Sequence, residues 1–338
     1  MKKSLDQKLQ AIRQNSGGKT FILADAKDAD MAWGIASPGS PWPADPARPF
    51  RSMPEFCQDI RAIVRQELVD IMLASVSVMH QLAHEERLFD HSPVTPAIRA
   101  NDTTDVWIAR GARYRQQPSR AFSTCYIEEA QFGGLATSRQ DPPTVNLGLY
   151  SITFTNDLAT DHANLETFRA FRAEAERRGF RYFLEVFDPN TDAGLTAEQI
   201  PAFVNDSIVR TLAAVPAPGR PQFLKIAYHG PRWLEELVNY DPSVVVGILG
   251  GGAGTTLDAF KLLADAQKYG ARVALYGRKI KEAEDPLAFI RHLRLVVDEG
   301  LDPAEAVRSY HRDLQKQKLP AKRSLEDDLQ ITHTILHY

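Results

Sequence analysis

The sequence predicts a single α/β domain with a (β/α)8 TIM-barrel fold. Three observations support this prediction. About eight short apolar runs alternate with longer amphipathic segments, which is typical of parallel strands connected by helices. Two of the amphipathic segments end at a glycine, as helices often do. The length of 338 residues also suits one barrel with insertions.

The expected strands recur from the start of the chain to its last third. They cover residues 20–25, 69–75, 97–101 (a less regular run), 145–151, 181–187, 222–228, 243–249 and 272–276. Eight strands, each followed by a helix, is the number that closes a parallel barrel. A doubly wound open sheet needs fewer strands, and the glycine fingerprint that would follow its first strand is missing.

The clearest expected helices are residues 164–178, which precede Gly179, and residues 255–269, which precede Gly270. We expect a helical lead-in at residues 1–18 and a helical extension at residues 301–338, both within one domain spanning residues 1–338.

Two irregular insertions interrupt this pattern. Residues 37–54 are rich in proline, and residues 113–143 contain paired glycines and paired prolines. Long loops on a barrel usually decorate the end where loops follow strands. These insertions could cover a site, form a contact between subunits or be plain surface loops, and we expect a homo-oligomer.

Composition excludes several classes of protein. A net charge of -3 argues against binding nucleic acid through a general basic field. Cys57 and Cys125 are the only cysteines, so a disulfide scaffold is excluded. The polar N-terminus lacks the features of a signal peptide, and no apolar run is long enough to span a membrane. We therefore expect a cytoplasmic protein with neither nucleic acid nor membrane as a partner.

A glycine cluster directly after an expected strand is the strongest local signal. It contains Gly250, Gly251, Gly252 and Gly254, and an amphipathic helix follows. Glycines allow backbone amides to approach an anion closely, and the helix start adds a positive dipole end. The cluster therefore predicts a phosphate-binding loop, although not a nucleotide P-loop, because the Lys-Ser/Thr pair is absent. A flexible turn is the alternative.

Gly277 and Arg278 follow the last expected strand. Barrels often build a phosphate site from the loops after their final two strands, and arginine offers a fixed, charged fork for phosphate oxygens. A surface salt bridge is the alternative role for Arg278.

Lys225 lies within an apolar strand, where an unpaired ammonium is costly to bury. Because burial disfavours the charged form of an amine, and an amine attacks a carbonyl only when uncharged, Lys225 is a candidate Schiff-base nucleophile. A structural lysine in an ion pair is the alternative.

Acidic residues within strands supply candidate acids and bases. We expect Asp25 and Lys27 at the end of the first strand, and Glu185 within the fifth, at inward positions where a charge is costly unless the chemistry uses it. Structural salt bridges are the alternative.

The histidines do not predict a metal site. His80 and His84 are four residues apart, and His91 follows, but the HExxH pattern and a third ligand are missing. Exposed or capping roles are expected for them, and we expect neither a metal nor a cofactor.

These residues together resemble the metal-independent class I aldolases of the barrel superfamily, which includes tagatose-bisphosphate, fructose-bisphosphate and deoxyribose-phosphate aldolases. The resemblance extends from Phe21 to about Gly300 and is closest in pattern to the tagatose branch. It implies a barrel fold and a phosphorylated sugar as substrate.

The resemblance also implies roles for individual residues. Lys225 matches the imine-forming lysine of the sixth strand, Asp25 the acid of the first and Glu185 the glutamate of the fifth. The phosphate elements match the glycine cluster and the segment that begins at Gly277-Arg278.

Two departures accompany this resemblance. The family often has a lysine on the fourth strand, where the sequence places Asn146, and the seventh strand lacks the second lysine of the deoxyribose branch. A deoxyribose substrate is therefore disfavoured, while a bisphosphate, a monophosphate and a sulfonated ketose stay open.

The sequence thus predicts a lyase that cleaves or forms a carbon–carbon bond in a phosphorylated ketose. Glu185 is the first choice for proton transfer during imine formation, and Asp25 and Tyr228 are the alternatives for the hydroxyl proton at the cleaved bond. A barrel isomerase or synthase is one rival function. A phosphosugar-binding regulatory protein without turnover is another, and Asn146 is the departure that motivates it.

Overall fold

A computed structural model of the chain describes residues 2–14, 18–135, 142–252 and 254–338. Eight parallel strands close into a barrel, in the order β1-β2-β3-β6-β7-β8-β9-β10 and back to β1. Their bounds are β1 Ile22–Lys27, β2 Ile71–Ala74, β3 Thr95–Arg99, β6 Leu147–Thr153, β7 Arg181–Phe187, β8 Leu224–Ile226, β9 Gly247–Leu249 and β10 Val273–Tyr276. The predicted barrel is confirmed, with each strand within a few residues of its expected range.

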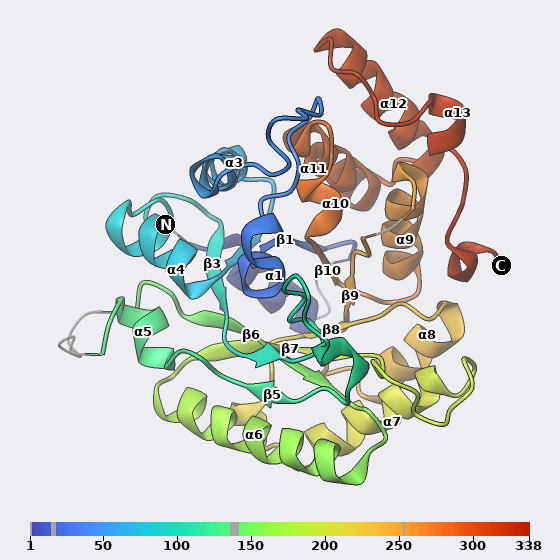
Figure 1. Cartoon of the computed structure of the whole chain (residues 1–338). Coiled ribbons are helices and arrows are strands. Elements are labelled where there is room, and N and C mark those ends of the chain that lie inside the picture. Colours follow the sequence, from blue (N-terminus) through green and yellow to red (C-terminus); the bar gives the residue numbers. More distant parts are fainter. Residues whose placement is uncertain (1, 15–17, 136–141, 253) are drawn as a thin grey trace.

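Helices surround the strands (Figure 1). Their bounds are α1 Ser4–Arg13, α2 Asp30–Trp33, α3 Met53–Gln66, α4 Val76–Met79, α5 Ile127–Phe132, α6 Leu158–Arg177, α7 Ile200–Ala213, α8 Pro231–Tyr240, α9 Thr256–Lys268, α10 Arg278–Lys281, α11 Pro286–Arg294, α12 Pro303–Lys316 and α13 Leu325–Asp328. Gly179 and Gly270, which follow α6 and α9, have positive φ angles of 60° and 104°, as the sequence predicted for helix ends. Of the expected lead-in, residues 1 and 15–17 lie outside the described residues.

Alternate residues of each strand face opposite sides of the barrel wall. Side chains such as Ala24, Leu73 and Leu149 form the core inside the barrel. Their neighbours Leu23, Met72 and Tyr150 belong to the larger core between the barrel and the helices. A shift of one residue along a strand therefore moves a side chain from the interior of the barrel to the helical layer.

Helix α1 closes the N-terminal end of the barrel. Its Leu5 and Leu9 pack with the inward side chains Ile22, Ile71 and Phe183. The opposite end of the barrel, at the carboxyl ends of the strands, is its mouth. Catalytic residues of TIM barrels lie at this end.

Part of the loop that follows β3 crosses the mouth. Near one end of this loop, the amide of Ile108 donates to Ala32 O (2.8 Å), in the loop after β1. Near the other end, Gln117 O accepts a hydrogen bond from Asn190 Nδ2 (2.7 Å), in the loop after β7. A short antiparallel pair of strands, β4 Asp102–Thr103 and β5 Ala121–Phe122, flanks the segment on both sides. Since β1 and β7 are opposite one another in the barrel, residues 104–119 pass over the mouth. This covering segment starts earlier than the expected insertion 113–143, of which residues 136–141 lie outside the described residues.

No helix among the described residues is both long and apolar enough to cross a membrane.

Candidate active site

Lys225 and Glu185 form an ion pair inside the barrel. They are register partners on β8 and β7, the sixth and fifth strands of the barrel, and both have the inward orientation. Lys225 Nζ lies 2.6 Å from Glu185 Oε1, and the two side chains are only 9% and 2% exposed. This arrangement holds an amine beside a carboxylate that can accept its proton.

Two further residues hold Glu185 in place. Ser151 Oγ donates to Glu185 Oε2 (2.6 Å), and Arg99 Nη2 donates to Ser151 Oγ (3.1 Å). Arg99 Nη1 lies 3.8 Å from Glu185 Oε2 and 2.9 Å from Asp28 Oδ2. Glu185 therefore has one oxygen fixed by Ser151 and Arg99 and the other directed at Lys225.

Alternating charges connect Asp28, Arg99, Glu185 and Lys225 across the barrel. Burial alone would lower the pKa of Arg99, but Asp28 and Glu185 together raise it, so the guanidinium stays charged. Two cations and two anions thus compensate one another, as buried charges must.

Sequence analysis missed Arg99, Ser151 and Asp28. For Ser151 and Asp28 the available signal was position, since Ser151 ends its expected strand and Asp28 follows the first, and barrels place functional side chains at the carboxyl ends of strands. Arg99 lay in the middle of its expected strand, 97–101, and is at a carboxyl end because β3 covers Thr95–Arg99.

The expected inward position of Asp25 and Lys27 is wrong. Ala24 and Ala26 pack with the barrel interior, whereas Leu23 packs with the helical layer. Asp25 and Lys27 share the orientation of Leu23, and they form an ion pair of 3.1 Å between the barrel and the helices. The strand extends two residues further than expected, so that Asp28, not Asp25, joins the charges at the mouth.

Tyr228 also belongs to the helical layer. It packs in the outer core, and its hydroxyl lies 3.1 Å from the hydroxyl of Tyr338. Burial raises the pKa of Tyr228 to about 12. The structure therefore does not bring Tyr228 to Lys225.

Asn146 lies at the far end of the barrel from the mouth. It precedes β6, accepts a hydrogen bond from Gln131 Nε2 (3.0 Å) and donates to Gly179 O (3.1 Å). The fourth-strand residue in register with Glu185 is Ser151. The structure therefore does not bring Asn146 to Lys225 and Glu185.

The glycine cluster and Arg278 do converge. A Cβ atom placed on Gly252 would lie 2.2 Å from Arg278 Cζ, so the guanidinium rests against this glycine. Gly277 approaches Ala26 O closely, which brings the loop after β10 toward β1. In the described part of the chain, Arg278 has no hydrogen-bond or ion-pair partner, and neither do the amides of Gly251, Gly252 and Gly254. Ala253 lies outside the described residues.

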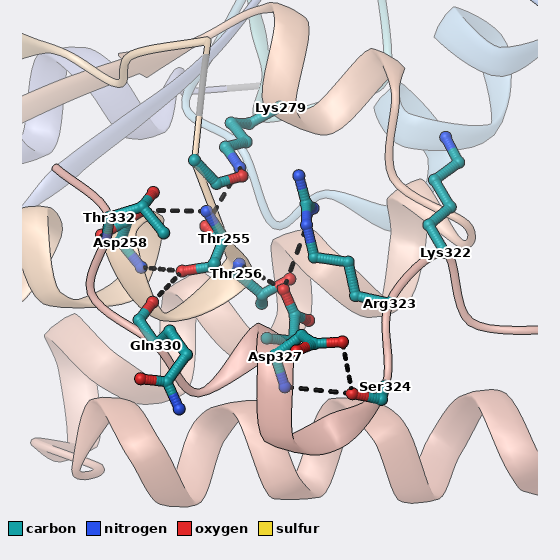
Figure 2. A network of polar contacts seen from close by, with 12 residues as sticks. Thr255, Thr256, Asp258, Lys279, Lys322, Arg323, Ser324, Asp327, Gln330 and Thr332 are labelled. Carbon is teal, nitrogen blue, oxygen red and sulfur yellow. Dashed lines mark hydrogen bonds and ion pairs between the residues drawn. The ribbon is translucent and has the colours of Figure 1, made fainter.

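The backbone amides at the start of α9, which the sequence analysis expected to be open to an anion, already have acceptors within the protein. The amide of Thr255 donates to Asp258 Oδ2 (2.8 Å) (Figure 2). The amide of Thr256 donates to Asp328 Oδ1 (2.7 Å), which belongs to residues 317–338 beyond α12, the C-terminal segment. The amide of Gly250 donates to Leu275 O (2.7 Å) within the barrel wall. An anion could therefore use only the middle of the loop, together with nearby cations.

A cavity of ≈340 Å³ lies beside this loop. Gly250, Gly251 and Lys279 line it, as does His229, whose Nε2 lies 2.9 Å from Asp188 Oδ2. Residues 333–336 of the C-terminal segment form another wall. Lys225 is not among the lining residues, but Ala227, two residues further along the chain, is.

The described histidines make other contacts. His84 Nε2 lies 3.0 Å from Ala130 O, and His80 Nε2 lies 3.4 Å from Glu85 Oε1. Within residues 2–14, 18–135, 142–252 and 254–338, no group of three or more His, Cys, Asp or Glu side chains is arranged to hold a metal ion.

Comparison with known proteins finds likeness in structure alone: no family model and no curated protein matches the chain. An archaeal fructose 1,6-bisphosphate aldolase has a TM-score of 0.60 and 17% identity, covering 87% of this chain and 99% of its own. A Schiff-base-forming fructose-1,6-bisphosphate aldolase has a TM-score of 0.62 and 17% identity, covering 87% and 100%. Cgl0159 from Corynebacterium glutamicum has a TM-score of 0.58 and 13% identity, covering 88% and 94%. At these identities, the likeness establishes a shared barrel fold.

Asp25 should make the stability of the protein depend on pH. Burial raises its pKa to about 6, against the attraction of Lys27. Because the folded state then holds this proton at a pH where the unfolded state has lost it, stability should fall as pH rises from about 4 to about 6, by on the order of 3 kcal/mol. Urea unfolding of wild type and Asp25→Asn across this range measures the effect.

As pH rises between these values, the unfolding free energy of wild type should fall relative to that of Asp25→Asn, so the two curves should diverge. Asp206→Asn, at an exposed carboxylate on α7, is the control for a general change in charge. Parallel curves for wild type and Asp25→Asn would contradict the assignment.

Proposed function

We propose that this protein is a class I aldolase that cleaves or forms a carbon–carbon bond in a phosphorylated ketose through an imine on Lys225. The observation that carries the proposal is the 2.6 Å contact between Lys225 Nζ and Glu185 Oε1 inside a closed barrel. The shared fold with Schiff-base-forming aldolases supports it.

Glu185 is the proton carrier in this proposal. It accepts a proton from Lys225, whose free amine attacks the ketone, and returns the proton to the carbinolamine hydroxyl, which leaves as water. The resulting iminium accepts the electron pair of the carbon–carbon bond as that bond breaks. The proton of the hydroxyl group that becomes the aldehyde passes to Glu185, which is a carboxylate again once water has left. Asp25 and Tyr228 have no part in these steps, because both lie outside the barrel interior.

The free amides of the glycine loop and the guanidinium of Arg278 are the proposed phosphate ligands. Strands β9 and β10, whose loops carry them, directly follow Lys225's strand in the barrel. A phosphate held there leaves the carbonyl end of a short sugar free to extend toward Lys225.

The regulatory alternative is motivated by the absence of a lysine on the fourth strand, and β6 has none. Asn146 lies at the N-terminal end of that strand, away from the mouth. The register position beside Glu185 holds Ser151, which contacts Glu185 directly.

The imine can be tested by chemical trapping. Incubation with dihydroxyacetone phosphate and borohydride, followed by peptide mapping by mass spectrometry, should place a reduced adduct on Lys225. The adduct should form in excess EDTA, because an amine and a carboxylate supply every step. Lys225→Met should abolish it, whereas Lys268→Met, at an exposed lysine of α9, should retain it. An adduct on another lysine, with none on Lys225, would overturn the assignment and leave an isomerase or synthase as the better reading.

Ser151 should control how fast the imine forms. Loss of a hydrogen bond to an ionised carboxylate costs about 1.5–3 kcal/mol, so Ser151→Ala should slow trapping by roughly tenfold or more. Thr153→Val is the matched control, since Thr153 Oγ1 donates to Asp105 instead (2.9 Å). Equal trapping rates in both variants would show that Ser151 does not orient Glu185.

Arg278 should be needed for phosphorylated ligands. A charge-assisted contact contributes about 1.5–3 kcal/mol to binding. Arg278→Ala should therefore weaken the binding of dihydroxyacetone phosphate by roughly ten- to a hundredfold, as measured by calorimetric titration. Binding of dihydroxyacetone itself should change far less. A similar loss for both ligands would argue against a phosphate contact.

A further inference from the structure

The chain beyond α12 returns to the glycine loop, although it is distant in sequence (Figures 1 and 2). Gln330 O accepts a hydrogen bond from Thr255 Oγ1 (2.6 Å), and the amide and hydroxyl of Thr332 donate to Asp258 (2.9 and 2.6 Å). Together with the contact between Asp328 and the amide of Thr256, these bonds fix the C-terminal segment against the start of α9.

Two carboxylates lie beside the proposed phosphate loop: Asp258 of α9 and Asp328, which the attached C-terminal segment supplies. Burial alone would raise the pKa of Asp258 and of Asp328, but hydrogen bonds outweigh burial and lower both. Thr332 and the amide of Thr255 bond Asp258, while His311 and the amide of Thr256 bond Asp328. Both groups are therefore ionised at neutral pH. A phosphate that approaches the loop meets two negative charges, so binding requires more than one compensating cation.

Three cations are available, Arg278, Lys279 and Arg323, and they differ in how far other contacts already hold them. Lys279 Nζ donates to Gly254 O (2.6 Å) and Thr255 O (3.0 Å), which fixes the end of the loop. Among the residues that the structure describes, Arg323 Nη1 has only a long contact of 4.0 Å with Asp328 Oδ1, and its side chain is 47% exposed. Burial and, to a lesser extent, the positive charge of Arg323 lower the pKa of Lys279 to about 8.

The direction of Arg323 is consistent with a role at the loop. Figure 2 shows its guanidinium pointing toward Lys279 and the start of α9. The neighbouring Lys322 has other partners: its ammonium donates to Glu282 O, and its amide donates to Glu284 Oε1 (2.7 Å).

We propose that the C-terminal segment is part of the ligand site and supplies Arg323 as a second guanidinium, which holds the phosphate of the substrate together with Arg278. The proposal rests on the proposed function for the substrate class. In it, Lys279 shapes the loop, and the two arginines approach the same phosphate from the loop after β10 and from the C-terminal segment.

The test measures binding of inorganic phosphate and of dihydroxyacetone phosphate to the full chain by calorimetric titration. Arg323→Gln should weaken the binding of both ligands by about tenfold, because a charge-assisted contact to the phosphate is lost. Arg323→Lys should recover part of the affinity, since it restores the charge but not the fork. Arg312→Gln, at an exposed arginine of α12, removes the same charge from a neighbouring element and should change binding less than about twofold.

Thermal unfolding of each variant shows whether a loss of affinity follows from a loss of structure. Equal phosphate affinity in Arg323→Gln and wild type would overturn the proposal, as would equal losses in Arg323→Gln and Arg312→Gln. Borohydride trapping of unphosphorylated dihydroxyacetone by the wild-type chain reports separately on the imine. Trapping on Lys225 together with unaffected phosphate binding in Arg323→Gln would therefore remove this inference and leave the proposed function intact.

Discussion

The buried ion pair between Lys225 and Glu185 is the interaction on which the arrangement of the mouth depends. Either charge alone would be too costly inside the barrel, and the pair needs further partners for its remaining hydrogen-bonding groups. Ser151 and Arg99 supply them for Glu185, and Asp28 balances Arg99. These residues come from different strands or strand ends, so the closed barrel is what brings the charges together.

Alternate residues of a strand face opposite sides of the barrel wall. This alternation explains which site residues could be predicted from the sequence. Lys225 and Glu185 each lie inside a short run with apolar residues on both sides, so the sequence predicts that both are buried. Asp25 lies at the end of its expected strand, but the observed strand continues to Lys27. Whether Asp25 faces the barrel interior or the helices depends on which of its neighbours face the interior. The structure assigns Ala24 and Ala26 to the interior, and Asp25 therefore faces the helices. Small inward residues gave no local signal of this orientation.

The fold was predictable because each of its units is specified locally. Apolar runs mark the strands, and Gly179 and Gly270 mark helix ends through a backbone conformation that glycine adopts readily. The segment that crosses the mouth and the return of the C-terminal segment were not predictable in this way. Both are held by hydrogen bonds between distant positions, such as Asn190 with Gln117 and Thr256 with Asp328, and no periodic pattern encodes such pairs.

The glycine loop shows how a local motif and its surroundings can differ. By itself, a glycine cluster before a helix predicts an anion at the helix start. Here Asp258 and Asp328 already take the amides at that start, so the dipole of α9 serves to hold the C-terminal segment. In the proposed site, the anion instead contacts the amides of Gly251, Gly252 and Gly254 and the adjacent cations. Since β8, β9 and β10 are consecutive in the barrel, the proposed site is on the same side of the mouth as Lys225. A carboxylate cap on the helix and a phosphate site for the substrate are therefore compatible, provided that arginines offset the added negative charge.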